Sequence, residues 1–304
     1  MSSDHSFEIS AEEADERLDV VLARHLDLSR AQTRKLLERG DVRLDGTPVD
    51  RSVKGVALSA GSRIEVAGFV HPKDQGALPE PETELRVLAE GPGWVAVEKP
   101  AGVPVHPLEP EEGGTVLNAL LARRPEVQGV GDGGLRSGVL HRLDVWTSGV
   151  LLFATEADAW AQLREGFASH AVEKTYRALV SGAPPDAGRI DLRLVVAQHR
   201  PAFVKVAKGH GGKGTRMSYR VVERFAWASL VEVALETGFL HQIRVGFAHT
   251  GHPLLGDPVY APELADAAPR QMLHCARLAI GDVEAESPDP PDLREVLDAQ
   301  RAAP

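Results

Sequence analysis

The chain has 304 residues, of which 43% are hydrophobic and 26% are charged, and this composition is typical of an ordinary globular protein. Its single cysteine, Cys275, excludes a disulfide framework and a cysteine-rich zinc site and is typical of a reducing compartment. The N-terminal segment is acidic and lacks the apolar core of a signal peptide, and no apolar run is long enough to cross a bilayer. We therefore expect a cytoplasmic protein, with a length that favours two domains.

The formal net charge of −10 argues mildly against a nucleic-acid partner, but the charges are unevenly distributed. Residues 17–63 contain ten Lys and Arg against six Asp and Glu. The acidic residues gather before residue 17 and after residue 257. A basic patch can therefore exist on this acidic protein.

Residues 7–67 are predicted to form a small first domain. Apolar residues at helical spacing predict a helix over 17–26, and a second helix follows with Ser29 as its N-cap and Gly40 just past its end. A hairpin turning at Asp45-Gly46 and a strand over 61–66 complete the domain.

The exposed face of the second predicted helix is a basic stripe. Two helices of this kind followed by a hairpin resemble the S4-like RNA-binding domain, in which the second helix contacts RNA phosphates. The alternative is an ordinary solvated basic face, which is common on helices. The resemblance makes four residues candidates for RNA binding: Arg30, Arg34, Lys35 and Arg39.

Residues 68–84 are rich in Pro, Gly and acidic residues and are predicted to be a linker, so that a second domain covers 85–283. It is expected to open with strands over 85–88 and 94–97 and a loop at Lys99–Gly102. A helix beginning at Thr115 and a Gly-rich loop over 127–136 come next.

The stretch HRLDVWTSGVLLFA, residues 141–154, combines a polar cluster with a short apolar run. Val150 to Phe153 predict a strand buried on both faces, which would hold Asp144 firmly at its entrance. From spacing alone, Asp144 could simply cap the turn and pair with Arg142. Its position beside a turn of small residues also makes it a candidate functional carboxylate.

The remainder of the domain alternates strands and short helices. His241 and Arg244 fall three residues apart on one short helix that ends at Gly251. Residues 209–215, GHGGKGT, do not fit a phosphate-binding loop and are predicted to be a mobile surface loop. The other expected elements are a helix starting near 155–158, strands over 174–182, 230–238 and 271–280, and an acidic, flexible tail over 284–304 with one possible helix at 292–301.

Four blocks lie in this second domain in a particular order: KPAGVPVHP, HRLDVWTSGVLLFA, EKTYRALVSG and TGFLHQIRVGFAHTGHPLLGD. Together they resemble the RluA-type pseudouridine synthase family over about residues 85–281. The resemblance implies an α+β protein, with a small S4-like αα-hairpin domain before a catalytic domain. The catalytic domain would have a mixed, mostly antiparallel central sheet with flanking helices.

The resemblance also assigns roles to particular residues. Asp144 would be the catalytic nucleophile and Arg244 the partner of its carboxylate. Tyr176 would stack against the target base and could help to move its proton. Arg142 and His241, in the HRLD and HQIR blocks, would contact RNA, with Arg142 helping to flip out the base or to hold the backbone.

These residue types suit the isomerisation of uridine to pseudouridine. An aspartate is ionised at neutral pH and needs no activating base, and a neighbouring arginine keeps it so when RNA excludes water. The base must leave its stack, and an aromatic side chain compensates for the lost stacking. The reaction has no redox step and no hydrolytic water, so neither metal nor cofactor is implied.

Three positions depart from the family pattern. Phe239-Leu240 replaces the usual Arg-Thr, Gly246 stands where His is frequent, and Val145-Trp146 follows Asp144 where a charged or small second residue is more usual. These changes leave the RNA contacts, and hence the target site, open.

Two alternatives have a basis in the sequence. His141 with Asp144, and His249 with His252, are spaced as metal ligands in a hydrolase. A non-catalytic RNA-binding protein with a degenerate synthase domain is the other. The S4-like pattern favours large-subunit ribosomal RNA over transfer RNA as the substrate, and we expect a monomer.

Overall fold

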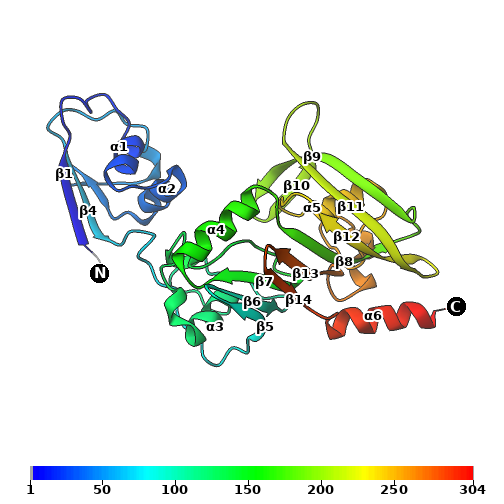
Figure 1. Cartoon of the computed structure of the whole chain (residues 1–304). Coiled ribbons are helices and arrows are strands. Elements are labelled where there is room, and N and C mark those ends of the chain that lie inside the picture. Colours follow the sequence, from blue (N-terminus) through cyan, green and yellow to red (C-terminus); the bar gives the residue numbers. More distant parts are fainter. Residues whose placement is uncertain (1–2, 304) are drawn as a thin grey trace. The chain divides into compact units, whose positions relative to one another are not determined.

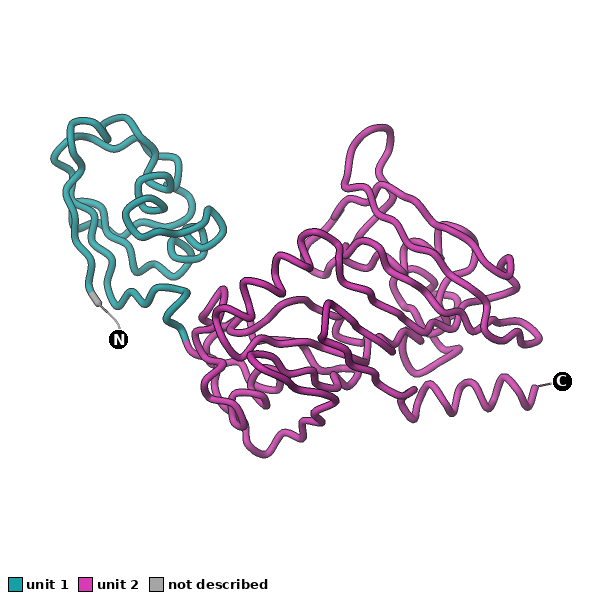
Figure 2. The backbone as a smooth tube through the Cα atoms, in the orientation of Figure 1, with its two compact units in different colours: residues 1–75 teal, residues 76–304 magenta. Residues whose placement is uncertain are grey.

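The computed structural model describes residues 3–303 and divides the chain into two compact units, residues 1–75 and 76–304 (Figure 1, Figure 2). The division falls inside the segment 68–84 that the sequence marks as a linker. The part of that segment after residue 75 differs from a free linker, because it packs on the second unit. Ala77 is buried there, and the Asn118 side chain donates a 2.6 Å hydrogen bond to the carbonyl of Leu78.

The first unit is an antiparallel sheet with two helices. Its strand order is β1-β4-β2-β3, and Leu18, Leu22, Leu37 and Ile64 are among the residues that fill its core. Strand β1 was not expected from the sequence. The elements are β1 (Ser3–Glu8), α1 (Leu18–His25), α2 (Arg30–Arg39), β2 (Val42–Leu44), β3 (Thr47–Val49), η1 (Arg51–Val53) and β4 (Arg63–Phe69).

Helix α2 has the ends that its sequence predicts. The Ser29 hydroxyl accepts from the backbone N–H of Gln32 while the Gln32 side chain accepts from the N–H of Ser29, which is a complete capping box. Gly40 follows the last residue with φ 78°, in the left-handed region that favours glycine. The basic stripe is therefore carried on a well-defined helix.

The second unit is built on one ten-stranded sheet with the order β10-β9-β11-β12-β8-β13-β7-β6-β5, and β14 pairs with β13 (Figure 1). Within the described residues the pairing is antiparallel except between β13 and β7. The sheet is thus mixed and mostly antiparallel, as predicted. Its first elements are β5 (Arg86–Gly91), β6 (Trp94–Lys99), α3 (Val116–Arg123), η2 (Pro125–Val127), η3 (Gly134–Arg136), β7 (Ser148–Ala154), α4 (Ala157–Ala168), β8 (Glu173–Ser181) and β9 (Ala187–His199). The later elements are β10 (Ala202–Val206), β11 (Lys213–Arg224), β12 (Ala228–Leu235), α5 (Gln242–His249), η4 (Pro262–Ala267), β13 (Leu273–Ile280), β14 (Val283–Glu286) and α6 (Pro291–Ala302).

Strand β7 lies deep in the main core. All of its residues are buried, and Val150 to Phe153 are inaccessible to solvent, as expected of a strand covered on both faces. It pairs with β6 on one side and with the start of β13 on the other. The loop that enters β7 is consequently fixed at its C-terminal end.

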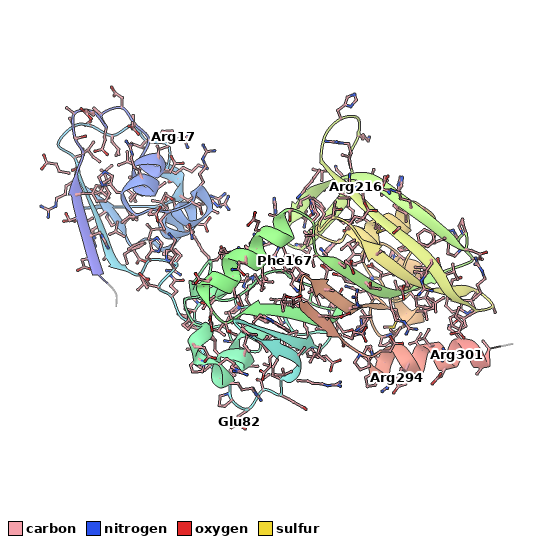
Figure 3. All side chains as sticks on the ribbon, in the orientation of Figure 1. Arg17, Glu82, Phe167, Arg216, Arg294 and Arg301 are labelled. Carbon is pink, nitrogen blue, oxygen red and sulfur yellow. The ribbon has the colours of Figure 1, made fainter. Side chains whose placement is uncertain are left out.

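The C-terminal segment corrects the prediction of a flexible tail over 284–304. Residues from Glu284 complete β14, and α6 buries Leu293 and Leu297 against a cluster that includes Leu179, Leu230 and Met272. Arg301 of α6 also donates to Glu223 on β11 at 2.9 Å (Figure 3). The acidic and Pro-rich composition predicted a flexible tail. Instead, two leucines four residues apart and the Arg301 contact hold the helix against the rest of the second unit.

The region 187–224 also differs from the prediction, which placed no strand there. It forms the long strands β9, β10 and β11, and the supposed loop 209–215 ends where β11 begins at Lys213. No helix among the residues that the structure describes combines the length and apolar character needed to cross a membrane.

Candidate active site

Asp144 lies in the loop that enters β7, at the start of a tight turn. The carbonyl of Asp144 accepts from the backbone N–H of Thr147 at 3.0 Å, which places Val145 and Trp146 at the two central positions of the turn. The Asp144 side chain retains 18% of its exposure, whereas the strand that follows is buried. A partly accessible carboxylate therefore lies in a loop that leads directly into a buried strand.

Gly149 lets β7 approach β13 beside this turn. Its φ is +118°, and a Cβ built there would lie 2.2 Å from the carbonyl oxygen and 2.6 Å from the nitrogen of Cys275. Gly149 pairs directly with Cys275 in the parallel register of the two strands. Only glycine fits at this contact, which explains its place directly after Thr147-Ser148.

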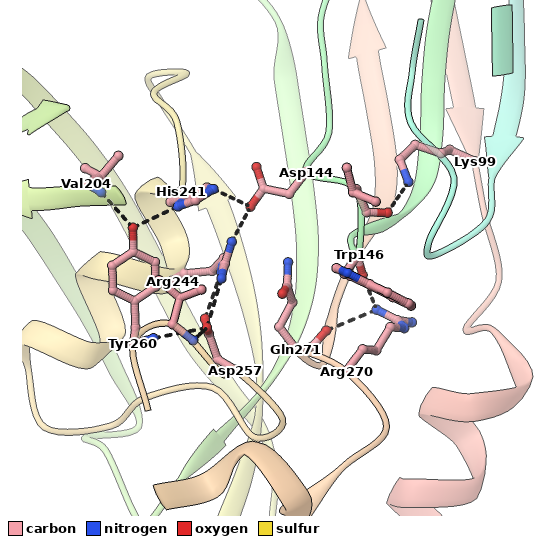
Figure 4. Close-up of polar contacts among 12 residues, drawn as sticks. Lys99, Asp144, Trp146, Val204, His241, Arg244, Asp257, Tyr260, Arg270 and Gln271 are labelled. Carbon is pink, nitrogen blue, oxygen red and sulfur yellow. Dashed lines mark hydrogen bonds and ion pairs between the residues drawn. The ribbon is translucent and has the colours of Figure 1, made fainter. Parts of the chain in front are cut away.

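Two buried cations anchor the backbone of the turn (Figure 4). The Nζ of Lys99, at the end of β6, donates to the carbonyls of Val145 at 2.7 Å and Pro100 at 2.8 Å. Arg270 donates to the carbonyl of Trp146 at 3.0 Å. The carbonyls of both central turn residues are thus held by side chains with less than a tenth of their surface exposed.

The Lys99 amine is fully buried, and burial is the main reason why its pKa falls from 10.5 to about 7. The charge of Arg270 lowers this pKa further, while the Asp144 carboxylate opposes the shift. The charge on Lys99 therefore titrates near neutral pH.

Arg244 joins Asp144 to a second carboxylate, Asp257. One guanidinium nitrogen, NH1, donates to Asp144 Oδ2 at 3.1 Å. The other two nitrogens form a bidentate pair with Asp257, at 2.7 Å from Nε to Oδ2 and 2.9 Å from NH2 to Oδ1. All three nitrogens of Arg244 are therefore engaged, which fixes the orientation of the donor that meets Asp144.

Asp257 is inaccessible to solvent and is held in turn by the backbone N–H groups of Val259 and Tyr260, at 3.0 and 3.2 Å from Oδ1. Burial by itself would raise the pKa of Asp257, but the hydrogen bonds and charge of Arg244 outweigh burial and hold this pKa below its usual value. Asp257 therefore remains a carboxylate and a counter-charge for Arg244.

His241 and Tyr260 complete this side of the site (Figure 4). The Tyr260 hydroxyl lies 2.8 Å from His241 Nδ1 and accepts from the N–H of Val204 at 3.0 Å. We assign the hydroxyl as the donor to Nδ1, which leaves the imidazole proton on Nε2, 3.9 Å from Asp144 Oδ2. Burial lowers the pKa of His241, so the ring is neutral at neutral pH.

Tyr176 lies on β8, opposite Cys275 of β13 and Val233 of β12. It is buried, and burial raises the pKa of its phenol well above 10, with smaller contributions from Cys275 and from Asp144. Tyr176 is therefore a neutral phenol within electrostatic range of Asp144.

The structure thus brings together Asp144, Arg244 and His241, while Tyr176 lies on β8, which is separated from β7 by β13. Arg142 is exposed and makes no ion pair with Asp144 among the described residues, so the interpretation of these two as a structural pair is wrong. The basic stripe, by contrast, lies in the first unit, whereas these residues all lie in the second.

Sequence reasoning missed the charged residues behind the site, namely Lys99, Asp257 and Arg270. Lys99 ends an apolar strand, which was a readable sign of a buried charge with a specific partner. Asp257 falls in the block that ends HPLLGD, but its pairing with Arg244, thirteen residues earlier, depends on the loop between them.

Two of the departures from the family pattern are packing residues here. Phe239 and Leu240 pack against a small cluster of Leu194, Val204 and Val245. At Gly246 a Cβ would lie 2.3 Å from the tip of the Met217 side chain, so the helix sits close to β11 at this point.

Two of the three histidines of the metal-hydrolase alternative, His141 and His252, have other partners. The His141 Nε2 accepts from the N–H of Leu152 at 3.0 Å, and His252 Nδ1 lies 3.0 Å from the carbonyl of Ser181. Burial lowers the pKa of His141 to about 3, so it is a neutral acceptor. Within residues 3–303, no group of three or more His, Cys, Asp or Glu side chains is arranged to hold a metal ion.

Comparison with known proteins points to one family. The sequence profile of the family described as RNA pseudouridylate synthase matches residues 93–249. A relative from Mycobacterium bovis, described as an uncharacterized RNA pseudouridine synthase, is 38% identical over 294 residues, covering 92% of this chain and 93% of its own. The ribosomal large subunit pseudouridine synthase D of Nitrosomonas europaea is 35% identical over 303 residues, covering 95% and 85%.

A solved structure agrees with these sequence matches. The human RNA pseudouridylate synthase domain containing 1 protein superposes with a TM-score of 0.58 at 25% identity, over 74% of this chain and 98% of the human one. The human domain containing 4 protein, at 23% identity and the same TM-score, shares the fold.

Proposed function

Because the chain belongs to the RNA pseudouridylate synthase family, we propose that Asp144 is the nucleophile with which it isomerises uridine in large-subunit ribosomal RNA. The observation that carries this proposal is the hydrogen bond from Arg244 to Asp144, in which the arginine is itself fixed by the buried Asp257. A partly exposed carboxylate with a preorganised cation is suited to attack a bound substrate.

The reaction conserves the atoms of the nucleotide. The bond between N1 of the base and C1′ of the ribose breaks, a bond between C5 and C1′ forms, and the proton on C5 is lost while N1 gains one. Asp144 would hold one fragment covalently while the base reorients, by attack on either the ribose or the base ring. Arg244 would keep the carboxylate ionised once RNA covers the site.

We propose that the Tyr176 ring lies against the flipped uracil. Burial keeps its phenol protonated in the RNA-free protein, so ring contact is the role that this state supports directly. His241, with a proton on Nε2 facing Asp144, is placed to donate to a substrate oxygen or phosphate near the carboxylate. Arg142 is exposed beside the same loop and would contact the RNA backbone or take the space of the flipped base.

The first unit would supply sequence-independent affinity. Arg30 and Arg34 are exposed on α2, and Lys35 and Arg39 lie on the same helix. Phosphate contacts by these residues would anchor a large RNA while the second unit selects the uridine. Ribosomal RNA is favoured as the substrate because the relative from Nitrosomonas europaea is named for the ribosomal large subunit. Transfer RNA is the alternative.

The test is pseudouridine formation on unmodified bulk ribosomal RNA and transfer RNA, with the wild type and Asp144→Asn. Product from the wild type alone would support Asp144 as nucleophile, and the RNA that carries the product identifies the substrate class. Asp186→Asn, which changes a carboxylate on the surface, is the matched control and should behave as the wild type.

Product from both wild type and Asp144→Asn would overturn the role of Asp144. If the wild type bound RNA but formed no product on either class, the non-catalytic RNA-binding alternative would replace this proposal.

A further inference from the structure

The turn that begins at Asp144 presents a large aromatic side chain to solvent. Trp146 retains 53% of its surface and its neighbour Val145 43%, although the strand that follows is completely buried. The hydrogen bond from Thr147 to Asp144 closes the turn, and its first and last Cα atoms therefore lie within about 7 Å of each other. The exposed indole thus belongs to the rim of the proposed active site.

This turn is rigid, unlike most exposed loops. The Val145 carbonyl accepts from both Lys99 Nζ at 2.7 Å and the N–H of Gly102 at 2.9 Å. The Trp146 carbonyl accepts from Arg270 at 3.0 Å. Both central residues are therefore fixed at the backbone, and the direction of the indole is set before any ligand arrives.

The indole also has a support on one side. A Cβ built on Gly102 would lie 3.2 Å from Cζ3 of Trp146, which shows that the ring packs against the Gly102 backbone. Gly102 has φ +84°, so glycine is favoured there for its conformation as well. A half-exposed aromatic ring that is backed by main chain and fixed at its own backbone has the properties of a stacking platform.

We propose that Trp146 stacks on a nucleobase that flanks the target uridine and so contributes to the choice of substrate. This inference rests on the proposed function, which places the reacting uridine at Asp144. Base flipping leaves the bases on either side of the uridine partly unstacked. An aromatic ring in the same turn as Asp144 can cover one of these bases. Exposed Arg142, two residues before Asp144, supplies a cation on the same loop for the backbone of that strand.

The first experiment compares wild type, Trp146→Ala, Trp146→Phe and Trp227→Ala on a short RNA that contains the uridine found to be modified. Trp146→Ala should raise KM by about 5- to 100-fold, the range that corresponds to one lost base–aromatic stack, with kcat changed far less. Trp146→Phe should recover most of the affinity, because it restores a ring. Trp227 is also exposed, but it directly precedes the first residue of β12, whereas Val233, which pairs with Tyr176, is near the last. Trp227→Ala should therefore match the wild type.

The second experiment identifies the base that stacks. Each nucleotide flanking the target uridine is replaced in turn by an abasic residue, and KM is measured for wild type and Trp146→Ala. At the position that stacks, the abasic substitution should weaken the wild type while leaving Trp146→Ala nearly unaffected. At the other positions, the two proteins should respond alike.

Several results would overturn the inference. An unchanged KM for Trp146→Ala would do so, as would an effect that is the same with every abasic RNA. Either result, obtained with a wild type that forms pseudouridine, leaves the proposed function intact. A wild type that forms no pseudouridine on any RNA overturns the proposed function and this inference together.

Discussion

The surroundings of Asp144 are fixed by a chain of buried charged residues behind it. Arg244 meets it with one nitrogen and gives the other two to Asp257, which is itself bound by two backbone N–H groups. The guanidinium is 5.1 Å from the centre of the Tyr260 ring, so its flat face is also covered. Such a set of contacts leaves Arg244 a single orientation, which is the condition for a preorganised site.

Asp257→Asn tests this positioning role. The amide removes the counter-charge of a buried guanidinium and sets an N–H group against one of its donors. We expect kcat to fall by about 10- to 100-fold with little change in the KM for RNA, because the carboxylate of Asp144 loses a correctly aimed partner. Steady-state kinetics on an RNA that contains the unmodified target uridine measures both parameters.

The same variant should lower the free energy of unfolding by about 3–5 kcal/mol, since it removes the fully buried counter-charge of the Arg244 guanidinium. Urea denaturation measures this. Asp186→Asn, at an exposed ion pair with Arg224, is the control and should change stability by less than about 1 kcal/mol. A wild-type kcat in Asp257→Asn would show that Arg244 is oriented without Asp257.

The buried Lys99 leads to a prediction about how the free energy of unfolding depends on pH. Its pKa falls from 10.5 to about 7 on folding, so between these values the unfolded chain binds more protons than the folded one at this site. The contribution of Lys99 to the free energy of unfolding must therefore rise as pH increases from about 7 to 10.5. The same contribution is lost as pH falls back through this range to about 7.

Lys99→Met removes the titrating group. Urea denaturation at several pH values between 7.5 and 9.5 should show the wild type gaining stability relative to Lys99→Met as pH rises. Parallel pH profiles for the two proteins would contradict the assignment. Because both proteins share all other titrating groups, the difference between the profiles isolates the lysine.

At the scale of elements, α6 supports the loop that carries Asp144. Asp292, in its first turn, pairs with Arg270 through both carboxylate oxygens. Arg270 in turn donates to the Trp146 carbonyl and to the Ser148 hydroxyl. Helix α6, at the far end of the sequence, thereby fixes the backbone of the turn that begins at Asp144.

Leu297→Ala tests how firmly α6 is docked. The leucine is 2% exposed and packs in the cluster with Leu230 and Met272, so its truncation should lower the free energy of unfolding by about 2–5 kcal/mol. Glu295→Ala, at an exposed position of the same helix, should change stability by less than about 0.5 kcal/mol. Chemical denaturation of both variants provides the measurement, and equal stabilities would mean that the helix is not docked in solution.

The sequence predicted those elements whose pattern is strong and local. The two ends of α2 at Ser29 and Gly40, the turn at Asp45-Gly46 and the burial of strand β7 are all as expected. The four blocks also placed Asp144, Arg244 and Tyr176 in one domain. These features depend on neighbouring residues or on the order of motifs, which a sequence displays directly.

Other elements were not predicted from the sequence, for two different reasons. Strand β9 has polar Arg189, Asp191 and Arg193 in alternation with Ile190, Leu192 and Leu194, and this two-residue period was a signal that went unused. The docking of α6 and the pairing of Arg244 with Asp257 depend on contacts between segments that no local pattern connects. Such contacts become visible only in the folded chain.

At the scale of the whole molecule, an acidic protein has to bind a polyanion. The net charge is −10, so long-range electrostatics opposes association with RNA unless local basic surface outweighs it. Residues 17–63 of the first unit hold ten Lys and Arg against six Asp and Glu, and this local excess of positive charge is what opposes the repulsion. Binding should therefore depend on salt through this unit in particular.

Replacing both Arg30 and Arg34 by Gln tests this dependence. If each arginine contacts a phosphate, the slope of log affinity against log salt should become shallower by about 1.4–1.8 in total. Fluorescence anisotropy with a labelled ribosomal RNA fragment measures the slope. The double variant Arg51→Gln and Lys54→Gln makes the same charge change on η1, and an equal effect there would show that total charge matters more than the α2 face.

The close approach of Gly149 to Cys275 has a consequence for the descent of this protein. Glycine is required at this position for steric reasons, since a Cβ there would lie 2.2 Å from a backbone oxygen. This requirement does not depend on whether Asp144 takes part in any reaction. A descendant that exchanged Asp144 for another residue would lose the proposed nucleophile yet still need Gly149 to join β7 to β13. Such a descendant would keep the glycine of the Thr-Ser-Gly triplet for packing alone. A Thr-Ser-Gly triplet in a related sequence therefore indicates that the two strands pack in this way, and activity has to be judged from the aspartate.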